Sequence, residues 1–363
     1  ERFILFIHFV HRLNRLKGRI TYALSVGLIF SIIGLMAVGF GQIDSSKYMS
    51  VDKPSDIIWS DTGFLVGTGD DGIRISLAST RLESVNLFAA TFKGADEIHM
   101  ASTLGPSFTE GNVYANRGDV IFEISKDGKT VRNFATPSPG SNIAALTFDI
   151  EKYWNYNLLA VTYDGSVWEI DENTQVTHIA NLGSDVAPNG LMVAPADFGD
   201  FSGDLLVSLA NENKVVSISH TDNSVSVFEE FPGEKPGMML YNIRLSTLYV
   251  SNNGDGSIVK IDQENTEAYF TQVMLVTENE QDGSKSINFI RSTRLGVEIT
   301  KLASGIVNPD FAGAVFVHDA AFEESLLVPE EEVPELDPRV VLYPILVLAA
   351  IGTFIVIWKF RGF

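Results

Sequence analysis

"GDLLVSLANENKVVSIS", residues 203–219, joins two apolar runs through a short polar turn. The runs are rich in Leu, Val and Ile, and the turn contains Asn211 and Asn213. Apolar strands separated by Asn, Asp or Gly are typical of β-hairpins. This stretch therefore predicts one hairpin of an antiparallel sheet.

Similar hairpins recur along the middle of the chain. Four further copies are GFLVGTGDDGIRISL, GNVYANRGDVIFEIS, NLLAVTYDGSVWEID and STLYVSNNGDGSIVKID, which begin at Gly63, Gly111, Asn157 and Ser246. A sixth, imperfect copy, GAVFVHDA, begins at Gly313 after a longer gap. The regular spacing of about 45 residues fits four short strands with their loops, which is one blade of a β-propeller.

The repeats predict an all-β, six-bladed β-propeller over residues 42–327, and five or seven blades fit the same spacing. Alternation of period two in SVWEID and SIVKID argues against a helical solenoid. Strands within residues 269–290 fill the longer gap. Because the ends of a ring must meet, residues 56–59 are the candidate closing strand.

Two uncharged apolar runs flank this region and predict transmembrane α-helices over residues 20–41 and 340–358. The first run is longer than an ordinary signal-peptide core, so we interpret it as an uncleaved anchor. Basic residues lie outside both runs, in an amphipathic segment at 1–19 and a tail at 359–363. The positive-inside rule then predicts cytoplasmic termini and a periplasmic, extracellular or luminal propeller, joined to the second helix by an acidic, Pro-rich stalk at 328–339.

The two predicted helices carry small residues at positions suited to close packing. These residues are Ala23, Gly27, Ser31, Ala349 and Gly352. They predict that the helices pair with one another; the alternative is that the small residues are incidental or face another subunit. The predicted partners are therefore the lipid bilayer and other membrane subunits.

Charge and cysteine content exclude several classes of function. The formal net charge is −20, and the basic residues near the termini leave the middle region more acidic still. Such a surface repels phosphate backbones, so nucleic acid is not an expected partner. The chain has no cysteine, which excludes disulfides and thiolate metal sites.

Residues 188–219 begin with Pro-Asn-Gly-Leu and continue through an apolar strand to the hairpin quoted above. This stretch resembles the blade signature of NHL and gluconolactonase-like six-bladed propellers, and residues 302–320 resemble a second copy. In gluconolactonase-like enzymes the Asn of that turn binds a divalent metal in the channel, which implies Asn189 as a ligand and Asp56 as a loose replacement for a family Glu. The family's Pro-Asp-Gly turn is missing, because Pro236 is followed directly by Gly237.

Two acidic groups are further candidates for chemistry. Asp197, Asp200 and Asp204 predict either a calcium site at the rim or a solvated loop, and their spacing lacks the alternation of a calcium-binding loop. His318 and Asp319 follow an apolar strand, where they would serve as a general base near the channel mouth or as structural residues.

The sequence thus predicts a membrane-anchored, extracytoplasmic interaction or scaffold module, an accessory subunit of a larger membrane complex. The alternative is a membrane-bound, metal-dependent hydrolase resembling lactonases, with Ca²⁺ as its cofactor and its site in the propeller channel.

Overall fold

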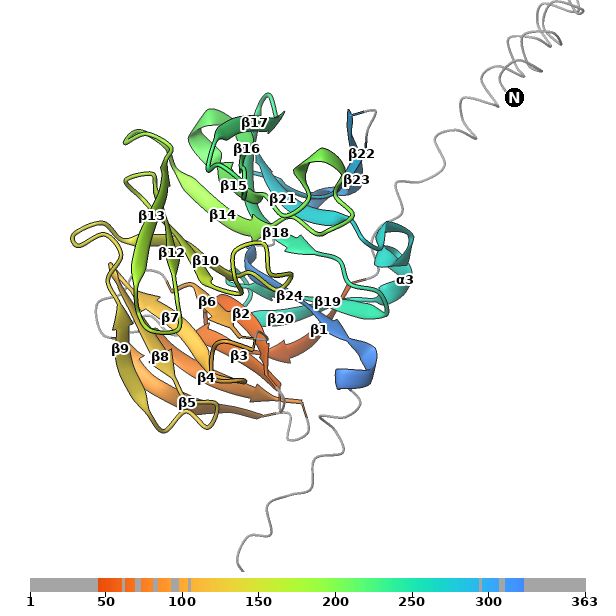
Figure 1. Ribbon diagram of the computed structural model, residues 1–363. Coiled ribbons are helices and arrows are strands. Elements are labelled where there is room, and N and C mark those ends of the chain that lie inside the picture. Colours follow the sequence, from red (N-terminus) through yellow and green to blue (C-terminus); the bar gives the residue numbers. More distant parts are fainter. Residues whose placement is uncertain are drawn as a thin grey trace, which may run out of the picture.

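The computed structural model describes residues 45–60, 63–68, 73–80, 84–92, 98–103, 106–293, 296–306 and 311–322. In this part of the chain the strands form six antiparallel sheets of four strands each, arranged as the blades of a ring (Figure 1). The prediction of an all-β, six-bladed propeller is confirmed. The alternatives of five and seven blades are excluded by this strand count.

The predicted anchors lie outside the described residues. The same holds for the basic N-terminal segment, the stalk, the C-terminal tail and the small residues Ala23, Gly27, Ser31, Ala349 and Gly352. Among the residues that the structure describes, no helix combines the length and the apolar character needed to cross a bilayer.

Blades 1 to 4 are each a continuous meander that runs from the innermost strand to the rim. Blade 1 contains β2 (Pro54–Ser60), β3 (Gly63–Thr68), β4 (Ile73–Ser79) and β5 (Ser84–Phe92). Blade 2 contains β6 (Met100–Ser102), β7 (Val113–Arg117), β8 (Val120–Ile124) and β9 (Val131–Ala135). Blade 3 contains β10 (Ile143–Phe148), β11 (Leu158–Thr162), β12 (Ser166–Ile170) and β13 (Val176–Asn181). Blade 4 contains β14 (Pro188–Val193), β15 (Leu205–Leu209), β16 (Lys214–Ile218) and β17 (Val225–Glu230), with the short helices η1 (Gly199–Phe201) and η2 (Ala210–Glu212).

Blades 5 and 6 are interlaced. From the channel outward, blade 5 consists of β18 (Glu234–Tyr241), β21 (Val273–Asn279), β22 (Lys285–Thr293) and β23 (Gly296–Ile306). Blade 6 consists of β24 (Phe311–His318), β19 (Ser246–Asn252), β20 (Ser257–Ile261) and β1 (Ser45–Ser50). The chain therefore leaves blade 5 after one strand, builds a hairpin of blade 6, and returns through α3 (Gln263–Thr266) and η3 (Glu267–Tyr269).

The closing strand differs from the one predicted. Residues 56–59 lie in β2, which is the innermost strand of blade 1, whereas β1 closes the ring by pairing with β20. The fifth and sixth hairpin copies also belong to one blade, because β24 pairs with β19. Residues 269–290 supply β21 and most of β22, as expected for the longer gap, and these strands belong to blade 5, which β23 completes.

Apolar side chains fill the space between neighbouring blades. Six buried clusters exist in the described residues, and each combines residues of two adjacent blades. The cluster between blades 6 and 1, for example, contains Met49, Phe64 and Tyr249. Full burial of such side chains contributes roughly 1.5–3 kcal/mol each, so the blades hold one another in place.

The six innermost strands begin at one face of the ring and end at the other. At the start of β2, Asp56 contacts Met100 of blade 2 and lies against Gly313 of blade 6. Similarly, Gly190 at the start of β14 lies against Gly237 of β18. We call the face where these strands begin the N face, and the opposite face the C face.

Both described ends of the ring lie at the C face. His318, the last residue of β24, pairs with Ser246 at the start of β19. At the same end of this sheet, Leu248 pairs with Ile261, and Ile261 pairs with Ser45, the first residue of β1. The chain thus enters the propeller and leaves it on one side.

Candidate functional site

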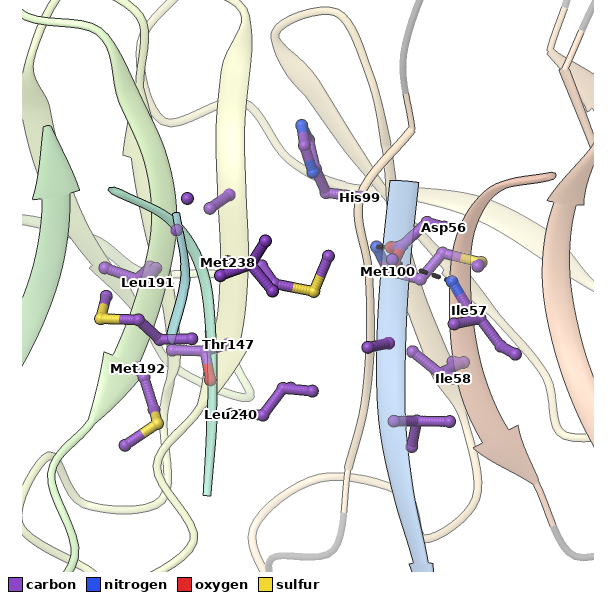
Figure 2. Close-up of a pocket in the computed structure, with 18 of the residues that line it drawn as sticks. Asp56, Ile57, Ile58, His99, Met100, Thr147, Leu191, Met192, Met238 and Leu240 are labelled. Carbon is purple, nitrogen blue, oxygen red and sulfur yellow. Dashed lines mark hydrogen bonds between the residues drawn. The ribbon is translucent and has the colours of Figure 1, made fainter. Parts of the chain in front are cut away.

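The innermost strands line a central cavity of about 830 Å³. Its walls are mostly apolar, and in Figure 2 the side chains of Met238 and Leu240 point toward the strands that carry Ile57 and Met100. An apolar cavity with a few polar groups is the usual form of a ligand site. The central channel is therefore the candidate functional site.

Irregular pairing at the N face shapes the mouth of the channel. The register shifts between Pro54 and Asp56, between Ile143 and Ala145, and between Pro188 and Gly190. β18 and β24 have shifts at the same level. Bulges of this kind turn side chains out of the regular alternation, which brings polar side chains to an otherwise apolar wall.

Asp56 joins blades at this mouth. One carboxylate oxygen, Oδ1, accepts a hydrogen bond from the Ile57 backbone N–H at 2.8 Å, and Oδ2 accepts one from the Met100 N–H at 2.7 Å. A Cβ placed on Gly313 would lie 2.5 Å from Oδ1, so glycine is required for this close approach. The carboxylate therefore links blade 1 to blade 2 and lies close to Gly313 of blade 6 (Figure 2).

Asn189 lines the channel at the bulge of β14 and is exposed there. Asn189 and Asp56 come from blades 4 and 1, which are three blades apart in the ring. Within the described ranges, no three His, Cys, Asp or Glu side chains gather in a way that could hold a metal ion. Calcium prefers six or more oxygen ligands. Because both Asp56 oxygens accept backbone N–H groups, the residues present fit Ca²⁺ poorly.

A row of charged side chains crosses blade 5 at the N-face mouth. Lys235 of β18 pairs with Glu278 of β21, which in turn pairs with Lys285 of β22. All three line the cavity, and Lys285 Nζ donates to the Phe311 carbonyl oxygen at 3.2 Å. The row carries two positive charges and one negative charge, and the Asp56 carboxylate adds a second negative charge at the same mouth. The sequence alone does not reveal this row, because the inserted hairpin β19–β20 separates β18 from β21 along the chain.

The carboxylate of Glu234, the first residue of β18, lies next to this row and is neutralised within blade 5. Its carboxylate accepts hydrogen bonds from Thr277 Oγ1 at 2.5 Å and from Lys301 Nζ at 3.0 Å. Burial raises the pKa of Glu234, but these two donors outweigh burial and hold the pKa below its usual value. Lys301 is thus engaged within blade 5.

The three aspartates predicted for a calcium site are not brought together as a ligand set. Asp204 accepts a hydrogen bond from Ser217 Oγ at 2.7 Å and lies 3.2 Å from His220 Nδ1. These contacts fix the Asp204 carboxylate against the β15–β16 hairpin. Asp197 and Asp200 are exposed in the loop before β15.

His318 and Asp319 are located at the C-face end of the innermost strand β24, but they do not line the cavity. Asp319 accepts a hydrogen bond from Thr247 Oγ1 at 3.0 Å, and His318 Nδ1 accepts one from the Ala320 N–H at 3.2 Å. The Asp319 side chain therefore ties the end of β24 to β19, and the His318 side chain stabilises the turn that follows β24.

The C-face mouth is aromatic and apolar. The residues that line it are Trp59, Phe148, Ile150, Tyr241, Ile243 and Phe316. Burial raises the pKa of Tyr241, and the nearby charges of Asp197 and Glu151 raise it further. The lining of the channel is therefore asymmetric, because Lys235, Glu278 and Lys285 line the N-face mouth whereas aromatic and apolar side chains line the C-face mouth.

A scan against protein-family models and a search of the curated proteins found no match. Among solved structures, virginiamycin B lyase from Staphylococcus aureus is 15% identical, with 55% of this chain and 68% of that chain covered and a TM-score of 0.32. A structural genomics protein from Bacteroides thetaiotaomicron is 14% identical, with 73% and 62% covered and a TM-score of 0.46. The extracellular domain of a one-component system from the same organism is 11% identical at a TM-score of 0.41, and the similarity covers 68% of this chain but only 32% of that chain. These similarities concern the propeller fold alone.

Proposed function

We propose that this protein is a membrane-anchored interaction module, an accessory subunit of a larger membrane complex with its propeller on the extracytoplasmic side. The observation that carries the proposal is the position of both ends of the ring at the C face, where β1 begins and β24 ends. The apolar runs at residues 20–41 and 340–358 are therefore joined to one face of the propeller. Ends at one face suit two anchors in one membrane, because both connecting segments then start on the side of the propeller that would face the lipid.

Outer strands with exposed apolar side chains supply the contact surface. On β17, the rim strand of blade 4, Val225 is 46% exposed and Val227 is 50% exposed. A rim strand has one unpaired edge, and soluble proteins usually protect such edges with charges or bulges. The β17 edge therefore suits pairing with a strand or an apolar surface of a neighbouring subunit.

A double substitution on β17 tests the proposal. Val225→Lys with Val227→Lys places two charges on the exposed edge, and we expect the full chain, extracted from membranes in mild detergent, to lose its partner subunits. The readout is the mass of the solubilised complex by size-exclusion chromatography with light scattering.

The matched control is Thr177→Lys with Asn181→Lys on β13, the rim strand of blade 3. Both control positions are exposed, so the same charges are added without removing an apolar contact. A control complex of unchanged mass supports the proposal. A wild-type chain that alkaline carbonate releases from membranes, or that leaves detergent extraction as a monomer, would overturn it.

A further inference from the structure

The C face carries exposed apolar side chains around the channel mouth. Ile150, which follows the end of β10, is 49% exposed, and Leu245, between β18 and β19, is 47% exposed. Trp59 and Tyr241 are half-buried and line the same mouth. Apolar side chains beside aromatic rings with polar atoms are typical of surfaces that lie at the interface of a bilayer.

Charged residues at this face have both signs. Lys152 and Arg244 are exposed beside Ile150 and Leu245 in the sequence. Glu151 and Asp197 lie close enough to Tyr241 to raise the pKa of its hydroxyl. A mixture of charges suits a zwitterionic lipid surface, whereas the acidity of the chain as a whole disfavours a strongly anionic one.

The segment that joins the first apolar run to the propeller, which we call the first tether, is short. The apolar run ends at Phe40 and β1 begins at Ser45, which is at the C face. A fully extended chain covers at most about 3.6 Å per residue, so Ser45 lies within about 18 Å of the end of the run. The headgroup layer occupies roughly 5–8 Å of that distance, which leaves little room for a water gap.

We infer that the C face of the propeller docks on the lipid surface through Ile150 and Leu245, so that the N-face mouth with its Lys235, Glu278 and Lys285 row opens away from the membrane. This inference rests on the proposed membrane anchoring. The inference adds the orientation of the propeller to the proposed function. It also assigns a zwitterionic lipid headgroup layer as the surface that covers the C face.

Single cysteines provide the test, because the chain contains none of its own. The full chain is labelled with a fluorophore at Ile150→Cys or Leu245→Cys and reconstituted in phosphatidylcholine vesicles that contain a nitroxide-headgroup lipid. The controls are Val227→Cys on the blade 4 rim and Asn253→Cys on the N face, both of which are exposed positions. We expect loss of fluorescence at positions 150 and 245 and little loss at positions 227 and 253.

Two further readouts separate the possible failures. Flotation of the vesicles reports anchoring, so a chain that does not float contradicts the proposed function itself. A chain that floats with equal quenching at all four positions overturns only the docking. A Gly-Ser insertion between Phe40 and Ser45 lengthens the tether, and quenching at Leu245→Cys that disappears with the insertion also overturns docking, because the face would then have no attraction of its own for lipid.

Discussion

Blades 3 and 4 differ from blades 5 and 6 in how the chain builds them. In blade 3, β10 to β13 follow one another in sequence and in space, and β14 to β17 do the same in blade 4. In blades 5 and 6, the hairpin β19–β20 separates β18 from β21, and β1 arrives from the other end of the chain. The first pair depends on local contacts, and the second pair depends on contacts between distant segments.

A hairpin and the blade that contains it are therefore specified by different interactions. The turn between β19 and β20 contains Asn253, Gly254, Asp255 and Gly256, which favour a local hairpin. The position of this hairpin between β24 and β1 depends instead on pairing with these distant strands and on packing against blades 5 and 1. Such nonlocal pairing forms only after long loops have closed, at a cost in chain entropy.

The largest expected effect concerns Tyr249, which lies on β19 and joins blade 6 to blade 1. Its ring centroid lies 4.6 Å from that of Phe64 and 5.3 Å from that of Tyr48. We expect Tyr249→Ala to lower the free energy of unfolding by about 3–5 kcal/mol, measured by chemical denaturation. Hydrogen exchange is also expected to accelerate in β1, because this strand depends on the same cluster.

Tyr114 provides the matched control in a sequential blade. It is buried like Tyr249, and its ring lies 4.9 Å from Phe134 and 5.3 Å from Phe148. Tyr114→Ala should lower stability by a similar amount while β1 keeps its protection from exchange. If β1 also keeps its protection in Tyr249→Ala, ring closure does not depend on this aromatic cluster.

A disulfide across blade 5 tests the interlaced topology directly. Lys235→Cys with Glu278→Cys places two thiols at directly paired positions of β18 and β21. Paired strand positions lie within disulfide reach. After oxidation we expect the bond to form and to raise the free energy of unfolding by about 2–4 kcal/mol, measured with and without reductant.

Glu169→Cys with Thr177→Cys is the control, because β12 and β13 pair within a sequential blade. This second bond should form readily but should stabilise less, since the loop it closes is short. A chain that oxidises at positions 169 and 177 but not at 235 and 278 would show that β18 and β21 are not neighbours.

The smallest expected effect is a loss of stability at high pH. Burial raises the pKa of the Tyr114 and Tyr249 hydroxyls above the ordinary value of 10.0. A raised pKa means that the neutral hydroxyl is favoured in the fold, so stability is complete below pH 10 and falls as pH rises above it. Each tyrosine contributes a slope of about 1.4 kcal/mol per pH unit.

Tyr249→Phe and Tyr114→Phe should each reduce this alkaline slope, measured as unfolding free energy against pH. Comparison of the two variants shows whether blade 6, which closes the ring, loses stability at a lower pH than blade 2. An unchanged slope in both variants would mean that other groups dominate alkaline unfolding.

The sequence predicted much of the fold but little of the site. The first five hairpin copies, the six blades and the strands within residues 269–290 follow from local patterns and are confirmed, whereas the sixth copy forms the single strand β24. The closing strand was assigned to residues 56–59 because alternation alone cannot distinguish an innermost strand from a rim strand. Asn189 and Asp56 do line the channel, yet the backbone N–H groups that occupy the Asp56 carboxylate come from its own chain neighbour and from another blade.

The sequence by itself determined where this protein forms strands and turns, because the alternation of apolar residues and the Asn, Asp and Gly turns act over a few residues. Only the tertiary structure decided which hairpin joins which blade, which strand closes the ring and which face receives both ends of the chain. Lys235 likewise joins Glu278 and Lys285 only because β18 pairs with β21, which follows the inserted hairpin in the sequence. These features depend on packing between sheets, and that packing is a property of the assembled ring rather than of any single segment.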